Sequence, residues 1–190
     1  YMPKVSVCIP VYNVEKYIER CAKSLFEQTL DDIEYIFVDD CSPDRSIEIL
    51  KDILETYPKR KLQTKILRMH KNSGLAEVRK MAVQYVTGDY VIHCDSDDWV
   101  DVNMYKMLYE NANEEDADVV VCDYWVTDGC SYYRKVNSCH SLTPNQMIVN
   151  CLYQRDHWSL CNKLFKRKSD SLSSLKEIKC SSIITECIYP

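Results

Sequence analysis

The sequence predicts an α/β protein with a Rossmann-like, mostly parallel sheet and helices on both of its faces. Short β-branched runs alternate with segments whose apolar residues recur at helical spacing, and turn-forming residues separate the two kinds of segment. This alternation continues through residue 125. Strands and helices in this order are typical of βαβ units with right-handed crossovers, which place helices over both faces of a parallel sheet.

The expected elements follow one another in a regular order. Short apolar, β-branched runs predict strands over residues 5–9, 33–38, 64–69, 89–94 and 118–128. Apolar residues at intervals of three and four predict helices over residues 14–29, 72–88 and 104–117, and another in the segment that begins at Pro43. From Ser169 onward the pattern gives no element, so the C-terminal part is expected to be incomplete or irregular.

Three positions are expected to begin or end these helices. Asn13 precedes the first helix, where its side chain can accept free backbone amides. Ser42 is expected to cap the second helix, with Pro43 in the first helical position, because proline has no amide hydrogen that needs a partner there. Gly88 is expected to close the third helix, since glycine commonly follows the last helical residue.

The composition limits the class of protein. The 190 residues accommodate one main domain, and no apolar stretch reaches the roughly 18 residues needed to span a bilayer. A formal net charge of −5 argues against nucleic acid as a partner, because nucleic-acid binding depends on clustered Lys and Arg. Eleven cysteines without a Cys-x-x-Cys pair favour reduced thiols in the cytoplasm. The alternative is that disulfides form among Cys122, Cys130, Cys139 and Cys151.

The stretch "YVIHCDSDDWVD" ends a predicted strand with Asp95, Asp97, Asp98 and Asp101. Carboxylates so close together repel one another unless water, a helix N-terminus or a cation offsets them. One interpretation is a solvated loop that caps the next helix. The other is a site for a divalent cation such as Mg²⁺, which binds carboxylate and phosphate oxygens together. The chain has three glycines and no glycine-rich phosphate loop, so a bound nucleotide would need such a counter-charge.

Other distinctive residues follow the neighbouring predicted strands. Pro10 and Tyr12 come after the first strand, and Asp39 and Asp40 come after the second. Ligands of parallel α/β sheets bind at the carboxyl ends of the strands. We therefore expect these residues to converge with the aspartates that begin at Asp95.

Four segments resemble the successive motifs of family-2 glycosyltransferases with the GT-A fold. They are "VSVCIPVYNVEKYIERCAKSLFEQT", "IEYIFVDDCSPDRS", "NSGLAEVRKMAV" and "TGDYVIHCDSDDWV", and a weaker match is "WSLCNKLFKR". The resemblance implies transfer of a sugar from a nucleoside-diphosphate sugar, a UDP-sugar above all, to an acceptor hydroxyl with inversion and with Mn²⁺ or Mg²⁺. It also implies a nucleotide-sugar-binding GT-A core over residues 1–125 and a partial or truncated acceptor-side region over residues 126–190.

The resemblance also implies roles for individual residues. Pro10 and Tyr12 would border the nucleobase, and Asp40 would hydrogen-bond the base or ribose. Arg79 would lie near the nucleotide, with a plain helix-surface charge as the alternative. In the Asp-x-Asp element, Asp95 and Ser96 belong to the donor site, Asp97 coordinates the metal and Asp98 positions the loop or the sugar. Asp39 is expected to cap or support its neighbour, or to contact the ligand.

The catalytic base is not identified by a motif. In the family it follows the Trp and Lys-Leu segment, which is present here as Trp158, Lys163 and Leu164, but no acidic pair follows. We hypothesise that the sequence from Ser169 is truncated or read in a shifted frame. Glu186 is kept as the candidate base, without a motif that supports it.

Two other functions remain open. One is a nucleotide-sugar-binding protein that has lost turnover, and the other is a nucleotidyltransferase, which normally needs a glycine-rich, basic triphosphate loop. The acceptor is expected to be a saccharide or a lipid-linked molecule, and homo-oligomerisation is open. The expected location is the cytoplasm, with peripheral membrane contact through Lys163, Lys166, Arg167 and Lys168, or with those residues forming an ordinary solvated face.

Overall fold

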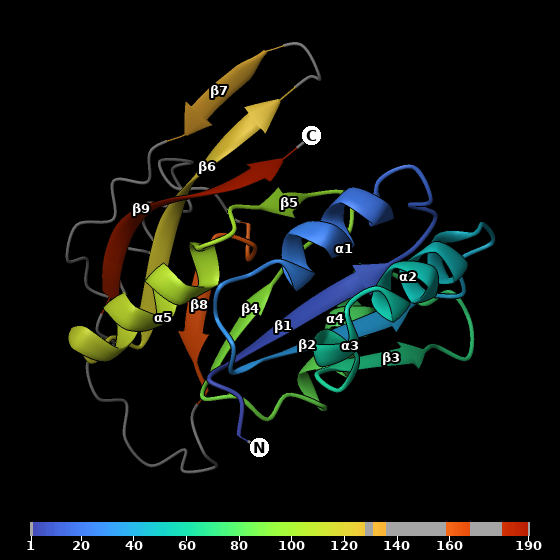
Figure 1. The fold of residues 1–190 in the computed structure, drawn as a ribbon, viewed down its shortest axis with the longest axis horizontal. Coiled ribbons are helices and arrows are strands. Elements are labelled where there is room, and N and C mark those ends of the chain that lie inside the picture. The colour runs from blue at the N-terminus through green and yellow to red at the C-terminus, as the bar shows by residue number, and fades with distance from the viewer. Residues whose placement is uncertain (1, 128–130, 136–158, 168–179, 190) are drawn as a thin grey trace.

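The computed structural model describes residues 2–127, 131–135, 159–167 and 180–189 (Figure 1). Its strands are β1 (Val5–Val11), β2 (Ile33–Asp39), β3 (Thr64–Arg68), β4 (Tyr90–His93), β5 (Trp99–Val100), β6 (Val119–Thr127), β7 (Tyr132–Lys135), β8 (Lys163–Lys166) and β9 (Cys180–Tyr189). Its helices are α1 (Ile18–Phe26), α2 (Ser46–Glu55), α3 (Pro58–Lys61), α4 (Leu75–Val83) and α5 (Met104–Glu114). The predicted α/β fold is confirmed.

One nine-stranded sheet forms the centre of the molecule, in the order β3-β2-β1-β4-β8-β6-β9-β5, with β7 paired to β6. The strands β3, β2, β1 and β4 are all parallel, as the alternating sequence pattern predicts. Within this half, Val5 of β1 lies opposite Ile33 of β2 and Tyr90 of β4, so the three strands begin together. The strand β4 is shorter and ends with His93 opposite Cys8. Beyond β4 the sheet is mixed, because β8 is antiparallel to both β4 and β6.

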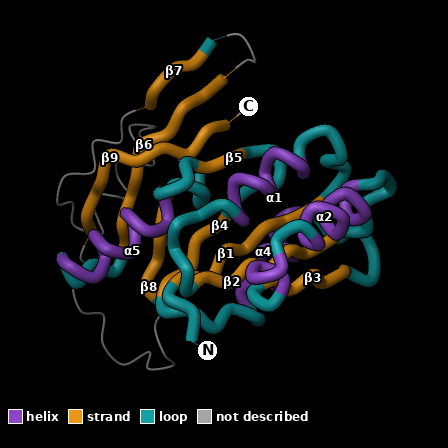
Figure 2. Tube along the Cα trace, viewed as in Figure 1, coloured by secondary structure: helices purple, strands orange, loops and turns teal. Residues whose placement is uncertain are grey.

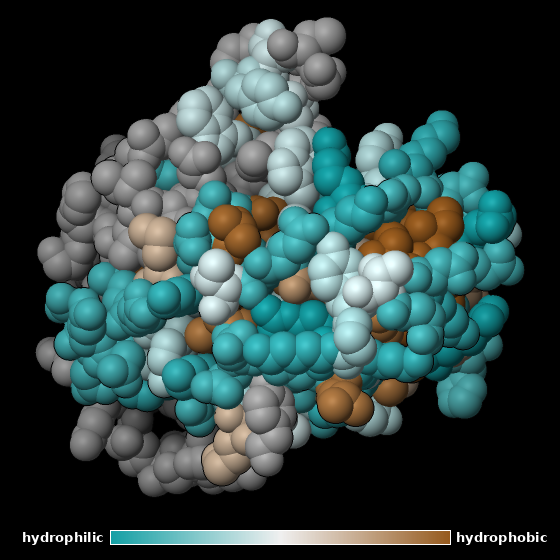
Figure 3. Space-filling view, viewed as in Figure 1, coloured by the Kyte–Doolittle hydropathy of each residue, from teal (hydrophilic) through white to brown (hydrophobic). Residues whose placement is uncertain are grey.

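Helices cover both faces of the parallel half (Figure 2). Alternate residues of β1 point to opposite faces, so Val7 packs in the core with α1, α2 and α5, whereas Cys8 packs with α4. All seven residues of β1 except Pro10 are buried, which explains why they are apolar apart from Ser6. The face that carries α1, α2 and α5 is mostly hydrophilic outside, with separate hydrophobic patches (Figure 3).

The predicted helix starts at Asn13 and Ser42 are wrong. Asn13 adopts a left-handed backbone with φ 55°, and α1 begins five residues later, after a turn closed by the Val14 carbonyl. Ser42 donates its hydroxyl to the Val11 carbonyl at 3.3 Å, so Ser42 and Pro43 belong to a loop tied to β1. These tertiary contacts replace the local capping that the sequence pattern indicated.

The predicted role of Gly88 is also wrong. The helix α4 ends at Val83, and Gly88 instead lies directly against β1. Its amide donates to the Ser6 hydroxyl at 2.9 Å, and a Cβ atom at this position would lie 2.8 Å from the same hydroxyl oxygen. Close approach of two backbones therefore explains why glycine occupies this position.

Four strands, β5, β7, β8 and β9, were not predicted. The strand β9 runs parallel to β6, with Cys180 opposite Val119, in the part of the chain where no pattern predicted an element. Because β6 crosses residue 125, the sheet continues across the predicted domain boundary, and the division at that residue stays a prediction. Within the described ranges, no helix is both long and apolar enough to cross a bilayer.

Six cysteines whose side chains the structure describes carry free thiols: Cys8, Cys21, Cys41, Cys94, Cys122 and Cys161. Most of them are buried, as expected for cysteines inside apolar strand and helix patterns. Of the four cysteines considered for disulfides, Cys122 is therefore free, while the other three lie outside the described residues.

Candidate functional site

A cavity of about 370 Å³ lies where the turns after β1, β2 and β4 meet. Since β1 is the middle strand of these three, their carboxyl ends share one edge of the sheet. Six residues singled out from the sequence line this cavity: Pro10, Tyr12, Asp40, Asp95, Ser96 and Asp97. The expected convergence is therefore present, and the roles of the six residues stay predictions.

Part of the lining is apolar and accessible. The Tyr12 side chain is 48% exposed, an unusual position for a large aromatic ring that directly follows a buried strand. Leu75 and Val78 of α4 also line the cavity, together with Pro10. A planar group such as a nucleobase can stack on an exposed aromatic ring beside apolar side chains.

Asp40 connects the cavity to the start of α4. Its buried carboxylate accepts the backbone amide of Ser73 at 2.7 Å and that of Gly74 at 2.9 Å. Gly74 has φ 82°, a conformation that glycine adopts without a steric penalty, and it immediately precedes α4. The Asp40 carboxylate therefore fixes the segment that begins α4, in addition to facing the cavity.

Asp39 has the structural role that was one of its two predicted alternatives. Its carboxylate accepts the Ser42 amide at 2.8 Å and pairs with Arg68 at 3.5 Å. Asp39 is buried and is absent from the cavity lining among the described residues. Its carboxylate therefore orders the loop after β2.

Arg79 extends from α4 to the loop of residues 95–101, called the acidic loop below. Its Nη2 atom donates to Oδ1 of Asp95 at 2.7 Å, and the Arg79 side chain is only 23% exposed. The alternative of a solvent-facing helix charge therefore does not describe Arg79. The guanidinium offsets part of the negative charge of the loop, and it engages one of the two oxygens of Asp95.

His93, at the end of β4, lies buried next to this ion pair. Burial and the neighbouring Arg79 cation lower the pKa of His93 to about 4, while Asp95 acts in the opposite direction. The imidazole is therefore neutral near pH 7. It adds no positive charge to the acidic loop, so Arg79 remains the cation that contacts Asp95.

The remaining aspartates of the loop occupy different positions. Asp97 is half-buried in the cavity wall, whereas Asp98 is buried and donates its amide to the Asp95 carbonyl at 3.1 Å. Asp101 accepts the amide of Asn103, the residue before α5, at 2.8 Å. Of Asp97, Asp98 and Asp101, only Asp101 therefore fits the interpretation that these aspartates cap the helix that follows.

A possible metal-ligand group combines Asp95, Asp98 and Cys161, whose ligand atoms lie within 4.8 Å of one another. Burial, followed by the two carboxylates, raises the pKa of the Cys161 thiol well above its usual range. A protonated thiol suits a hard cation poorly, while carboxylates suit Mg²⁺ and Mn²⁺ well. The donors that fit such a cation are therefore the carboxylates of the loop. The predicted ligand Asp97 is outside this group but lines the adjacent cavity.

Sequence reasoning missed several residues of the site. Asn72, Gly74, Leu75 and Val78 also line the cavity, and the "NSG" turn before α4 was the available signal for them. Cys161 was missed because nothing in its local sequence indicates that the chain returns to Asp95.

The basic residues near β8 do not form one exposed cluster in the described part of the chain. Lys163 is buried, and its ammonium group donates to the Ser159 carbonyl at 2.8 Å and to Asn162 at 2.9 Å. Both predicted interpretations, a lipid contact or a solvated face, are therefore wrong for Lys163. Lys166 pairs with Asp116, and Arg167 donates to the Gly88 carbonyl. Lys168 and Trp158 lie outside the described residues.

Glu186 lies in β9, opposite Asp123 of β6. This register places the residue within the sheet, and its assignment as the catalytic base stays a prediction.

Comparison with known proteins agrees with this geometry. The sequence model described as Glycosyl transferase family 2 matches residues 6–176. The uncharacterized glycosyltransferase EpsJ of Bacillus subtilis (strain 168) is 36% identical over 149 residues, which cover 78% of this chain and 40% of EpsJ.

Solved structures resemble the chain as well. The structure of S. aureus TarS 1–349 in complex with UDP-GlcNAc has a TM-score of 0.70 and 28% identity, covering 86% of this chain and 45% of TarS 1–349. The mannosyltransferase PcManGT from Pyrobaculum calidifontis, in complex with GDP-Man and Mn²⁺, shares the fold at 18% identity and a TM-score of 0.68, over 99% of this chain and 57% of PcManGT.

The chain spans less than two thirds of each of these proteins. Most of its own length is nevertheless covered by the family match, and the TarS structure shares its fold. The chain therefore belongs to glycosyl transferase family 2.

Proposed function

We propose that this chain binds a UDP-sugar with a divalent cation, Mn²⁺ or Mg²⁺, and transfers the sugar to an acceptor hydroxyl with inversion. The observation that carries the proposal is one cavity lined both by Tyr12 beside apolar residues and by the acidic loop at Asp95 and Asp97. A UDP-sugar has matching parts, since its base is planar and its diphosphate binds a cation. TarS, 28% identical, has been solved with UDP-GlcNAc, which supports this choice of donor class.

The acidic loop requires a cation if a diphosphate is to bind beside it. Carboxylates and phosphates repel each other, and a hard divalent cation coordinates the oxygens of both. Asp97 would hold this cation, with Asp95 and Asp98 as the neighbouring carboxylates. When bound, the cation acts as a Lewis acid that stabilises the charge on the departing diphosphate.

Three other features of the site concern the orientation of Asp95, the nucleoside part of the cavity and the general base. Arg79 fixes one oxygen of Asp95, so that carboxylate is held in one orientation before the ribose arrives. Asp40 holds Ser73 and Gly74 at the start of α4 and presents its carboxylate to the nucleoside part of the cavity. The acceptor hydroxyl must lose a proton to a general base. Glu186 is the candidate for that base, and the acceptor is a saccharide or a lipid-linked molecule.

Calorimetry and a donor-consumption assay test this proposal together. We expect UDP to bind in the presence of Mn²⁺ and to bind much more weakly after chelation, and UDP-sugar to release UDP when an acceptor is supplied. Binding without any donor consumption would favour a nucleotide-sugar-binding protein without turnover. Preference for a nucleoside triphosphate, with release of pyrophosphate, would favour a nucleotidyltransferase. UDP affinity that is independent of Mn²⁺ would contradict the metal-dependent donor site.

A further inference from the structure

Side chains from one side of α1, and from the turn after it, contact the backbone of residues 95–105. This stretch is called the acidic segment below. The Cys21 thiol donates to the Asp95 carbonyl at 3.8 Å. The Val100 amide donates to the Ser24 hydroxyl at 3.3 Å. Residues 21, 24 and 28 are spaced by three and four, which places them along one side of a helix and its extension. These side chains therefore contact the acidic segment at successive points.

Gln28 makes the largest number of these contacts. Its Nε2 atom donates to the Asp101 carbonyl at 2.6 Å and to the Ser24 carbonyl at 3.1 Å, while its Oε1 atom accepts the Tyr105 amide at 3.1 Å. The side chain is buried, with the residue 3% exposed. One neutral amide thus joins the end of α1 to both the acidic segment and the first turn of α5.

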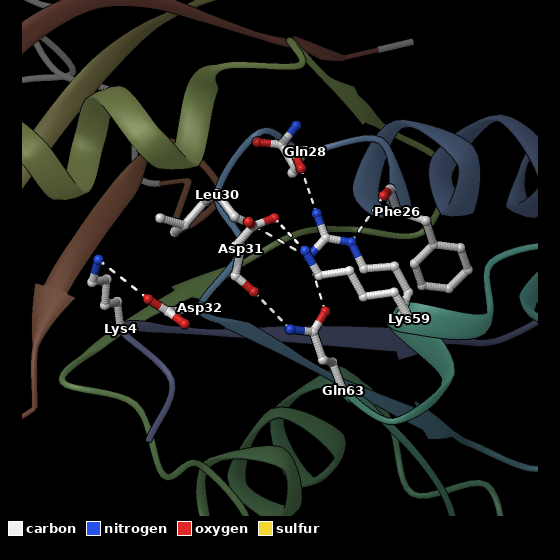
Figure 4. A network of polar contacts seen from close by, with 9 residues as sticks. Lys4, Phe26, Gln28, Leu30, Asp31, Asp32, Lys59 and Gln63 are labelled. Atoms are coloured by element: carbon white, nitrogen blue, oxygen red, sulfur yellow. Dashed lines mark hydrogen bonds and ion pairs between the residues drawn. The ribbon is translucent and has the colours of Figure 1, made fainter. Parts of the chain in front are cut away.

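A buried arginine in turn fixes Gln28. Arg60 donates from Nη2 to the Gln28 carbonyl, from Nε to the Phe26 carbonyl at 3.0 Å and from Nη1 to the Leu30 carbonyl at 3.2 Å. Figure 4 shows Phe26, Gln28 and Leu30 converging on this guanidinium. A cation is favourable at a helix C-terminus, where carbonyl groups lack partners within the helix. Arg60 therefore holds the turn from which the Gln28 side chain extends.

We propose that Gln28, held by Arg60, is a positioning residue for the part of the site that binds the cation and the diphosphate. This proposal rests on the proposed function. Asp95, Asp97 and Asp98 lie in a loop, and their mutual repulsion favours an open arrangement of that loop. Residues that bind a ligand directly must be held within about 0.5 Å of the binding geometry by supporting contacts. Gln28 supplies such support at Asp101, four residues beyond Asp97, while Cys21 contacts the carbonyl of Asp95 itself.

The nucleoside part of the cavity has separate supports. Asp40 is held by amides from Ser73 and Gly74, and its own amide donates to the Val11 carbonyl at 2.9 Å. None of these contacts includes Gln28 or Arg60. A positioning role for Gln28 therefore predicts loss of metal-dependent binding with retention of uridine binding, whereas general loss of structure would weaken both.

The test compares Gln28→Leu with the wild-type chain in calorimetric titrations of UDP with Mn²⁺ and of uridine without metal. Losing buried hydrogen bonds of this kind is expected to weaken Mn²⁺-dependent UDP affinity about tenfold and to leave uridine affinity unchanged. Lys59→Met is the matched control, because its exposed ion pair with Asp31 lies in the same region without contacting the acidic segment. Equal Mn²⁺-dependent affinity in Gln28→Leu and wild type would overturn the proposal.

Two further measurements keep the outcome decisive. If Gln28→Leu does not fold, Arg60→Lys replaces it, because lysine keeps the positive charge but has fewer donors for the carbonyl groups of the turn at Gln28. We expect a two- to threefold loss of Mn²⁺-dependent UDP affinity, and no loss would overturn the proposal. If the wild-type chain does not bind UDP with Mn²⁺, the proposed function fails. Hydrogen exchange of the Asp98 amide, which Gln28 does not touch, then decides the positioning role. Faster exchange in the folded variant supports the role, and unchanged exchange refutes it.

Discussion

The two edges of the parallel half-sheet differ in how many donors surround their carboxylates. At the amino edge, Glu34 accepts the Ser6 hydroxyl at 2.6 Å, the Thr87 amide at 2.6 Å and the Lys65 ammonium at 3.0 Å. At the carboxyl edge, Asp95, Asp97 and Asp98 lie within one short loop, where Arg79 is the described cation that pairs with Asp95. The chain therefore supplies several donors to Glu34 at one edge and concentrates negative charge in one loop at the other.

The carboxylate of Glu34 is used within the fold, whereas the carboxylates of the acidic loop face a cavity. Burial alone would raise the pKa of Glu34, but its hydrogen bonds with Ser6, Thr87 and Lys65 outweigh burial and lower that pKa. Hydrogen bonds to a carboxylate stabilise the charged form, so Glu34 stabilises the fold while ionised. The acidic loop instead leaves its charge facing a cavity, where an added cation can bind. The predictions below test this division, beginning with the largest expected effect.

Replacing Asp97 with Asn should affect binding far more than stability. Loss of a direct metal ligand is expected to weaken Mn²⁺-dependent UDP affinity by more than about 100-fold, since even indirect contacts to a metal contribute 10–100-fold. A half-buried loop residue contributes little to the core, so the free energy of unfolding should change by less than about 0.5 kcal/mol. Calorimetry and urea unfolding measure the two quantities. Unchanged Mn²⁺-dependent affinity would remove Asp97 from the metal site.

Replacing Glu34 with Ala should have the reverse effect. Several donors lose their shared acceptor, and the free energy of unfolding is expected to fall by about 2–3 kcal/mol. The amino edge is far from the cavity in the topology, so the folded variant should bind UDP and Mn²⁺ as the wild type does. Urea unfolding and calorimetry on the same sample check this. A folded Glu34→Ala chain with impaired UDP binding would show that the two edges are coupled.

The pH dependence of stability should also distinguish the edges. Because the pKa of Glu34 is lower in the folded chain than its ordinary value of 4.5, its contribution is present above that value. The contribution is lost as the pH falls below 4.5 and Glu34 becomes protonated in the folded state. Glu34→Gln should therefore lose less stability than the wild type as the pH falls below 5. Identical pH profiles would contradict the assigned role.

The carboxyl edge was predictable from the sequence because its signals are local. An apolar strand that ends in "DSDD" indicates both where the chain leaves the sheet and that negative charge lies at that point. The same holds for Pro10 near the end of β1, for Tyr12 directly after β1 and for Asp40 after β2. The alternation of strands and helices then places all three turns at one edge, since parallel strands end together.

The supporting contacts were not predictable, because they join residues distant in the sequence. The amides that hold Asp40 come from residues more than 30 positions away, and the carbonyl that receives the Gln28 amide lies 73 positions away. Ser42 carries an ordinary capping side chain, yet it contacts Val11 instead of starting a helix. The strands β8 and β9 pair with β4 and β6, so their places in the sheet depend on residues that are distant in the sequence.

Asp40 combines features of both edges, so its substitution should have an intermediate effect. Asp40→Ala removes the acceptor of the Ser73 and Gly74 amides, and the free energy of unfolding is expected to fall by about 1–2 kcal/mol. Uridine affinity should also decrease, even without metal. Asp40→Asn keeps one acceptor oxygen and should lose less stability. A variant with weaker folding but unchanged uridine affinity would give Asp40 a structural role alone.

The smallest expected effect concerns Cys41, next to Asp40. Its φ of 60° is a left-handed conformation that costs a non-glycine residue about 1 kcal/mol, and glycine avoids this cost. The thiol offsets part of it by donating to the Met69 carbonyl at 3.1 Å. Cys41→Gly should therefore raise the free energy of unfolding by about 0.5 kcal/mol, whereas Cys41→Ala should lower it, because alanine keeps the backbone strain and loses the thiol contact. If urea unfolding shows both variants to be destabilised equally, the thiol contact outweighs the strain, and the turn after β2 is stabilised by its side chains as fully as the amino edge is.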